Sequence, residues 1–205
     1  MPINTDNVWN REAEVSLDRA LECVWSCGPK DRFQSQTDAC VKAIVKYVPE
    51  NVRRLLDVGA GCGRLTVPIA KLYPQCDVVG YDFAPAMLAR LKESAVGLSN
   101  VRASSELGEV GPVSFAWSVV VLQHNEPHVV SNIIAAVAKQ LEPGGVFLYQ
   151  LVENVEINDW GHVPEAVARA WATDVGLTVD SVFRGMYDGD NNLCGDWIWV
   201  VARKA

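Results

Sequence analysis

The sequence predicts an α/β fold: a doubly wound, mostly parallel sheet of seven strands, with helices on both faces and one antiparallel strand near the edge. Two observations support this prediction. Apolar strand segments alternate with amphipathic helical segments along most of the chain, the pattern of parallel strands joined by crossover helices. The last two strand segments, at about 177–183 and 197–202, are joined by a loop rich in Asp, Asn and Gly, so the final strand must run antiparallel to its partner.

The length and composition of the chain fit one domain. Its 205 residues, 49% of them apolar, can bury one sizeable core, and no linker or repeat interrupts them. We expect a helical cap over residues 1–50 and an α/β core over residues 51–205. Apolar periodicity predicts two cap helices, the first from about residue 13 to a stop at Gly28-Pro29 and the second at about 36–47.

The core elements are set by apolar runs and by the residues that interrupt them. Pro74 and the pair Gly144-Gly145 end helices, and Pro85 suits the first turn of another. We expect strands near residues 55–57, 77–82, 100–103, 113–118 and 146–152, and helices near 65–72, 84–91, 125–141 and 164–174.

Charge and targeting signals narrow the class of protein. The formal charge is −7 and the basic residues are scattered, whereas a nucleic-acid surface needs a basic patch. The N-terminus lacks a signal-peptide core, and the longest strictly apolar run, at 133–138, is far too short to span a membrane. The six cysteines show no metal-ligand spacing. We therefore expect a cytoplasmic protein that binds no metal, no nucleic acid and no membrane.

The chain is organised around residues 57–63, Asp-Val-Gly-Ala-Gly-Cys-Gly, between an apolar strand and a helix. Glycine lets backbone pass close to a ligand, and the N–H groups at the start of the next helix favour an anionic or polar group. A dinucleotide fingerprint needs a glycine where Arg64 stands, so the loop predicts another adenine-containing cofactor. The alternative is an ordinary glycine-rich turn that binds nothing.

A second acidic residue fits the same kind of ligand. Asp82 follows an apolar strand and lies 19 residues beyond Gly63. A carboxylate at that place can accept hydrogen bonds from both ribose hydroxyls, which explains this spacing in nucleotide-binding α/β units.

Four segments in register resemble the class I S-adenosylmethionine-dependent methyltransferases, over a stretch from about residue 33 to the C-terminus. They are the glycine loop 57–63, the segment 82–88, the segment 118–124 (Ser-Val-Val-Val-Leu-Gln-His) and the turn 141–145 (Leu-Glu-Pro-Gly-Gly). The antiparallel final strand is a further point of resemblance. The family's usual acidic residue near the start of the fourth strand is replaced by Ser114, and Ala84 stands where a serine cap is commoner.

The resemblance implies S-adenosylmethionine as cofactor and a role for each matching residue. Asp57 would fix the loop and approach the amino group of the cofactor, while Asp82 would hold the ribose diol. Ser118 would lie beside the sulfonium. Gly59, Gly61 and Gly63 would let the backbone pass beside the methionine portion and the ribose. Phe83 and Met87 would pack near adenine, and Ser105 or Glu106 would contact its amino group.

Methyl transfer mainly requires alignment of donor and acceptor, and a base only where the acceptor must lose a proton. His124 is the first candidate base, because it lies near the expected pocket and titrates near neutrality. A histidine that caps the following helix is the alternative. His162 is a second candidate, and Trp160 and Tyr187 could cage a cation or stack on a planar ring.

The predicted function is methyl transfer to an oxygen or nitrogen atom of a small molecule. Enzymes that methylate base amino groups carry Asn/Asp-Pro-Pro-aromatic where this chain has Ser-Val-Val-Val, at 118–121. The alternatives are methylation of a protein or peptide side chain, a cofactor-binding partner or sensor without catalysis, and a nicotinamide-dependent oxidoreductase. The sequence leaves the acceptor and the oligomeric state open.

Overall fold

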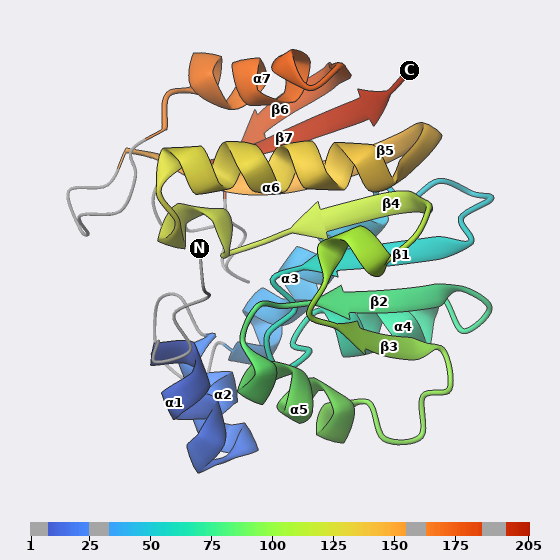
Figure 1. Cartoon of the computed structure of the whole chain (residues 1–205), viewed down its shortest axis with the longest axis vertical. Helices are drawn as coiled ribbons and strands as arrows, with labels where there is room; N and C mark the ends of the chain where they lie inside the picture. The colour runs from blue at the N-terminus through green and yellow to red at the C-terminus, as the bar shows by residue number, and fades with distance from the viewer. Residues whose placement is uncertain (1–7, 25–32, 155–162, 186–195) are drawn as a thin grey trace.

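A seven-stranded sheet with helices on both faces forms the body of the protein (Figure 1). The computed structural model describes residues 8–24, 33–154, 163–185 and 196–205. The strand order is β3-β2-β1-β4-β5-β7-β6. The strands are β1 Arg54–Val58, β2 Asp77–Tyr81, β3 Val101–Ser104, β4 Val113–Ser118, β5 Leu141–Asn154, β6 Leu177–Arg184 and β7 Asp196–Lys204.

Strands β1 to β5 pair in parallel, and β7 lies antiparallel between β5 and β6. The predicted doubly wound sheet with an antiparallel strand near its edge is therefore confirmed. Strand β5 begins five residues earlier than the apolar run at 146–152 suggested, because Leu141 pairs with Val113 before a register shift brings Val146 opposite Phe115.

The helices are α1 Val8–Val15, α2 Leu17–Cys23, α3 Phe33–Val45, α4 Thr66–Leu72, α5 Pro85–Ser94, α6 Pro127–Gln140 and α7 Glu165–Asp174. The single helix expected from residue 13 is wrong, because two helices meet at Ser16. Ser16 has an extended backbone, and its hydroxyl accepts a hydrogen bond from the Arg19 N–H at 3.1 Å, which starts α2 as an N-cap.

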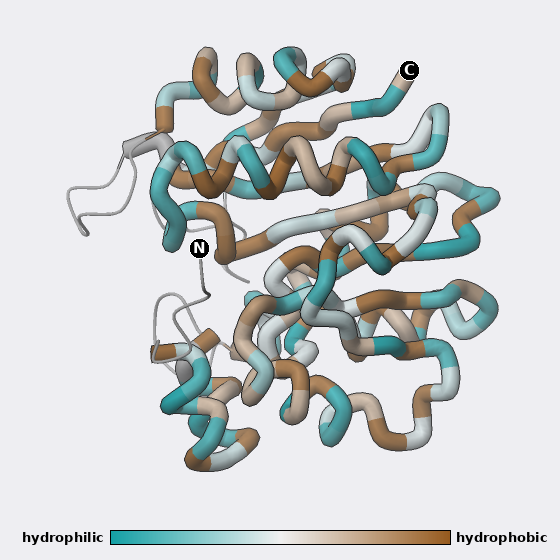
Figure 2. Tube along the Cα trace, viewed as in Figure 1, coloured by the Kyte–Doolittle hydropathy of each residue, from teal (hydrophilic) through white to brown (hydrophobic). Residues whose placement is uncertain are grey.

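The two faces of the sheet bury separate apolar clusters. Figure 2 shows hydrophobic residues in brown along both the strands and the helices. Helices α6 and α7 cover one face, through Ile134 and Ala168 among others. Helices α3 and α4 cover the other, through Ile44 and Ile69. None of the helices that the structure describes is long and apolar enough to cross a membrane.

The two halves of the expected helical cap lie in different places. Helix α3 packs on the sheet, whereas α1 and α2 lie beside α5 and pack on Cys62 and Met87 (Figure 1). Arg90 of α5 holds α1 in place, because its Nε donates to the Ala13 carbonyl at 2.7 Å. The N-terminal helices are therefore attached to the edge of the glycine loop.

Candidate functional site

The carboxyl ends of β1, β2 and β4 meet at one edge of the sheet, where chain order reverses and ligands of open α/β folds bind. The glycine loop follows β1 at this edge. It is tied to β2, because the N–H groups of Gly59 and Ala60 both donate to the Tyr81 carbonyl, at 2.8 and 2.9 Å. Hydrogen bonds within the protein thus hold the loop against the end of β2 without a ligand.

Asp82 follows β2 and anchors the middle of the loop. Its Oδ2 accepts from the Gly61 N–H at 2.8 Å and its Oδ1 accepts from the Ala84 N–H at 2.9 Å. The residue is 7% exposed, and this burial raises the pKa of the carboxyl, while the backbone donors oppose the rise. A carboxylate has about four acceptor sites, so the backbone N–H groups of Gly61, Ala84 and Phe83 leave capacity for a hydrogen bond from a ligand.

The three glycines of the loop differ in what surrounds them. A Cβ on Gly59 would lie 2.4 Å from the Val121 side chain, and one on Gly63 would lie 2.6 Å from Leu91 Cδ1. These two glycines are required by their positive φ values, 81° and 91°, and by packing of the protein against itself. Gly61 has a φ of +53°. The atom nearest to a Cβ on Gly61 would be Val24 Cγ1, at 3.1 Å. Of the three, Gly61 therefore has the most space beside it, under the N-terminal helices.

Asp57 is buried at the end of β1 and connects the strand to α4. It is 3% exposed, and its Oδ2 accepts from the Thr66 hydroxyl at 2.7 Å. Burial raises the pKa of the Asp57 carboxyl to about 7, although the Thr66 hydrogen bond favours the charged form. This hydrogen bond ties β1 to the first turn of α4, and the role of Asp57 in fixing the loop stays a prediction.

The raised pKa of Asp57 predicts a pH dependence of stability. The folded state holds its proton up to about pH 7, whereas the unfolded chain loses it near 3.8, so the free energy of unfolding should fall between those values as the pH rises. Asp57→Asn removes the buried charge and keeps an oxygen for Thr66. The variant should match wild type at about pH 3, below the unfolded pKa, and exceed it at about pH 8 by up to about 4 kcal/mol. Urea unfolding of both proteins measures this, and a difference that does not change with pH would contradict it.

The segment after β4 contacts the glycine loop from the other side. Ser118 is fully buried and its hydroxyl donates to the Val58 carbonyl at 3.0 Å, which ties β4 to β1. Contact of Ser118 with a sulfonium stays a prediction. Val120 has a φ of +61°, rare for a β-branched residue, and such strain costs on the order of 1–3 kcal/mol and is common at functional sites.

Gln150 is a buried polar residue next to this segment that the sequence reasoning missed. It lies on β5 and is fully buried, and its Oε1 accepts from the Val120 N–H at 3.1 Å. Its Nε2 has no hydrogen-bond partner among the described residues. The one available signal was a glutamine inside the apolar run 146–152.

His124 ends a short 3₁₀ turn, Leu122–His124, between β4 and α6. Its ring packs edge-on against Trp9 of α1, with centroids 5.2 Å apart, and its Nε2 lies 3.3 Å from Gln123 Nε2. Burial lowers the pKa of the imidazole, which is therefore neutral at pH 7. The side chain does not cap α6. His162, Trp160 and Tyr187 lie outside the described residues.

Comparison with known proteins places this geometry in a family. A family model described as a methyltransferase domain matches residues 55–145, from β1 through the turn into β5. The trans-aconitate 2-methyltransferase of Deinococcus radiodurans is 30% identical over 135 residues, 63% of this chain and 50% of that protein. The enzyme of the same description from Methylobacterium radiotolerans is 30% identical over 159 residues, 74% of this chain and 59% of that protein.

The fold agrees. The structure of magnesium protoporphyrin IX methyltransferase from Synechocystis, with bound S-adenosylmethionine, superposes with a TM-score of 0.71 at 15% identity and covers 99% of this chain and 98% of that one. A glycopeptide N-methyltransferase complexed with S-adenosylmethionine gives 0.68 at 13% identity, covering 83% and 94%. Residues 55–145 thus match a methyltransferase domain, and the fold is that of the class I S-adenosylmethionine-dependent methyltransferases. It spans about half the length of the curated relatives it matches.

The family uses S-adenosylmethionine, and the residues expected near adenine can now be placed in this methyltransferase domain. Met87 is buried with Ala13 and Ala20 beneath the N-terminal helices, and Phe83 beside it is half-buried. Ser105 and Glu106 are exposed after β3, and the charge of Glu106 contributes to raising the pKa of Tyr81, behind burial and Asp82. All four lie on the β2–β3 side of the loop.

Helix α1 bridges the two sides of the site. Asn10 of α1 accepts from the Ala86 N–H in the first turn of α5 at 3.2 Å, and Trp9 contacts His124 beyond β4. The described residues contain no cluster of three His, Cys, Asp or Glu side chains that could hold a metal ion.

Proposed function

We propose that the protein transfers a methyl group from S-adenosylmethionine to an oxygen or nitrogen atom of a small molecule. The observation that supports this most is the carboxylate of Asp82, oriented by the N–H groups of Gly61 and Ala84. It lies beside the glycine loop of a methyltransferase-family fold and retains hydrogen-bonding capacity for a ribose diol.

The proposed cofactor contacts follow from the places of the residues. Asp82 accepts hydrogen bonds from the ribose hydroxyls, and the backbone of Gly61 lies against the methionine portion. Asp57 approaches the amino group of the cofactor while Thr66 orients its carboxyl. Phe83 and Met87 pack near adenine, Ser105 or Glu106 contacts its amino group, and Ser118 lies at the strand end nearest the sulfonium.

When bound, S-adenosylmethionine supplies a methyl group already activated for displacement. The protein has to align the acceptor with it, and alignment can contribute roughly 7–11 kcal/mol at best. His124 is the proposed base for an acceptor that must lose a proton. Its neutral imidazole accepts that proton on a ring nitrogen, and Trp9 fixes the ring plane.

A small molecule is favoured as acceptor over a macromolecule. The net charge of −7 disfavours nucleic acid, and the relatives include enzymes described as trans-aconitate and magnesium protoporphyrin IX methyltransferases. Trans-aconitate is therefore the first compound to test. A cytoplasmic location is also proposed, since Cys40, Cys62 and Cys76 are buried free thiols, as expected in a reducing compartment.

The function is tested by binding and by turnover. Calorimetry should show binding of S-adenosylmethionine and of its demethylated product, and none of NAD. Methyl transfer from labelled S-adenosylmethionine to a metabolite panel should then reveal an acceptor. Binding of NAD alone would favour an oxidoreductase, while cofactor binding without transfer to any compound would favour a sensor or partner subunit.

A further inference from the structure

Gln150 occupies a place where an amide is costly. Along β5 its neighbours on the same face, Leu148 and Val152, belong to the apolar cluster that α3 and α4 cover. On the adjacent strand it lies opposite Trp199. Gln150 is 0% exposed, and a buried amide without partners is destabilising by roughly 1–3 kcal/mol.

The orientation of this amide is determined by its one hydrogen bond. Val120 N–H can only donate, so the atom 3.1 Å from it must be the oxygen of Gln150. The NH₂ group is then left with two donors and no hydrogen-bond partner among the described residues. The Gln150 NH₂ group can therefore donate a hydrogen bond to an oxygen atom of a bound molecule.

The amide also lies on the acceptor side of the site. The strand order β2-β1-β4-β5 puts Asp82 on one side of the glycine loop and Gln150 on the other. Val120, which binds Gln150, precedes Val121, whose side chain would meet a Cβ on Gly59. The Gln150 amide thus binds the residue next to Val121, and Val121 contacts the glycine loop where the methyl donor is proposed to lie.

A second amide with an unused polar atom comes from the same segment. Gln123 is buried, its Nε2 lies 3.3 Å from His124 Nε2, and its Oε1 has no partner in the described part of the chain. Gln150 therefore binds the segment 118–124 and Gln123 belongs to it, and both are buried amides with an unmet hydrogen bond. Native proteins rarely leave such groups unpaired, so each calls for a partner such as a water, an ion or a ligand.

We propose that Gln150 binds the methyl acceptor, donating from Nε2 to a carbonyl or carboxylate oxygen of that molecule. The inference rests on the proposed methyltransferase function. It restricts the acceptor class to small carbonyl compounds or carboxylic acids, and the hydrogen bond holds the acceptor by an oxygen on the β4–β5 side of the donor. Gln123 completes the polar lining next to His124.

The test compares acceptors that differ in one group. Trans-aconitate and the pairs 4-hydroxybenzoate with phenol and tyrosine with tyramine are offered with labelled S-adenosylmethionine. Transfer should occur only to compounds that carry the carboxylate. Transfer confined to phenol or tyramine would overturn the inference while supporting the function.

Two variants test Gln150 directly. Gln150→Glu keeps an oxygen for Val120 but loses the donor, and Gln150→Met loses both without adding charge. Both should raise the KM for the acceptor roughly 10- to 100-fold, the worth of a hydrogen bond to a charged group. Affinity for S-adenosylmethionine should stay within about twofold. Gln75→Glu, the same chemical change at an exposed turn beyond α4, should alter neither.

The outcomes separate the two proposals. An unchanged acceptor KM in a folded Gln150→Glu or Gln150→Met variant would show that Gln150 only supports Val120. A purely structural role would instead lower the melting temperature and weaken cofactor binding with no selective rise in KM. Cofactor binding without transfer to any compound in the panel would overturn the proposed function, and the inference with it.

Discussion

His124→Asn is expected to lower turnover roughly 100-fold, the usual contribution of a positioned base, if the acceptor is a hydroxyl or a protonated amine. Asparagine keeps hydrogen-bonding capacity beside Gln123 but cannot take a proton. The base acts when neutral, so the wild-type rate should fall as the pH drops through the pKa of His124. Because burial lowers that pKa, the fall should lie below pH 6.5. The variant should lack this acid limb, as measured by pH profiles of kcat.

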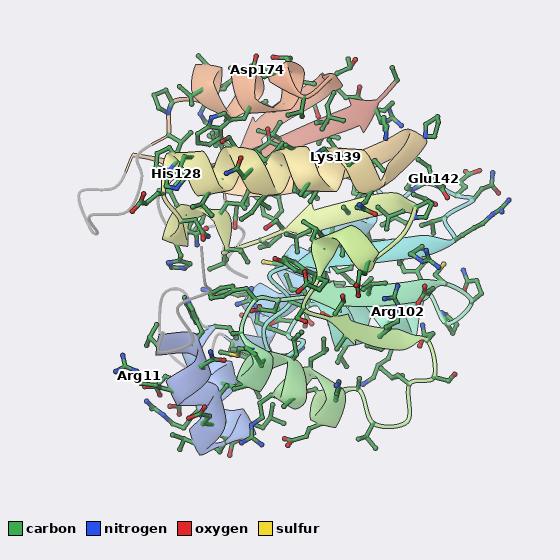
Figure 3. All side chains as sticks on the ribbon, in the orientation of Figure 1. Arg11, Arg102, His128, Lys139, Glu142 and Asp174 are labelled. Atoms are coloured by element: carbon green, nitrogen blue, oxygen red, sulfur yellow. The ribbon has the colours of Figure 1, made fainter. Side chains whose placement is uncertain are left out.

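The matched control is His128→Asn. His128 lies at the start of α6 (Figure 3). It is exposed, and its Nδ1 lies 3.2 Å from Glu126 Oε2. Its replacement should leave both rate and pH profile unchanged. Identical profiles for wild type and His124→Asn would instead mean that the acceptor is nucleophilic without a base, as a carboxylate is, and that His124 positions Trp9 of α1.

Asp82→Asn should weaken binding of S-adenosylmethionine by about 1.5–3 kcal/mol, the scale of hydrogen bonds to a charged group. The variant loses the charge and one acceptor oxygen, and its new NH₂ group faces a backbone N–H. The variant should also lose stability, because the Asp82 carboxylate accepts from the N–H groups of both Gly61 and Ala84 and its replacement leaves a buried donor unpaired.

Asp77→Asn separates the two effects. Asp77 begins the same strand, β2, and pairs with Arg54 at 2.6 Å at the opposite edge of the sheet. Both variants should melt below wild type, whereas only Asp82→Asn should lose cofactor affinity in calorimetry. Equal affinities in the two variants would remove Asp82 from the ribose role.

The order of strands and helices and the two acidic strand ends were predictable from the sequence, because they depend on local pattern. Alternating apolar runs with turn residues indicate crossovers, and Asp57 and Asp82 end apolar strands whose carboxyl ends must meet in a parallel sheet. The two helices that meet at Ser16 were missed although a serine N-cap is a local signal, since the apolar face continues across the break.

The tertiary structure alone decided which atoms near the site remain free. Gly59 and Gly63 have positive φ and also have the Val121 and Leu91 side chains where a Cβ would lie, and the Ser118 hydroxyl donates to the Val58 carbonyl. Gln150 is separated from Val120 by 30 residues, so no local pattern could join its oxygen to that N–H or show that its NH₂ stays unpaired among the described residues. Hydrogen bonds between distant segments depend on strand register, and register is set only when the sheet packs.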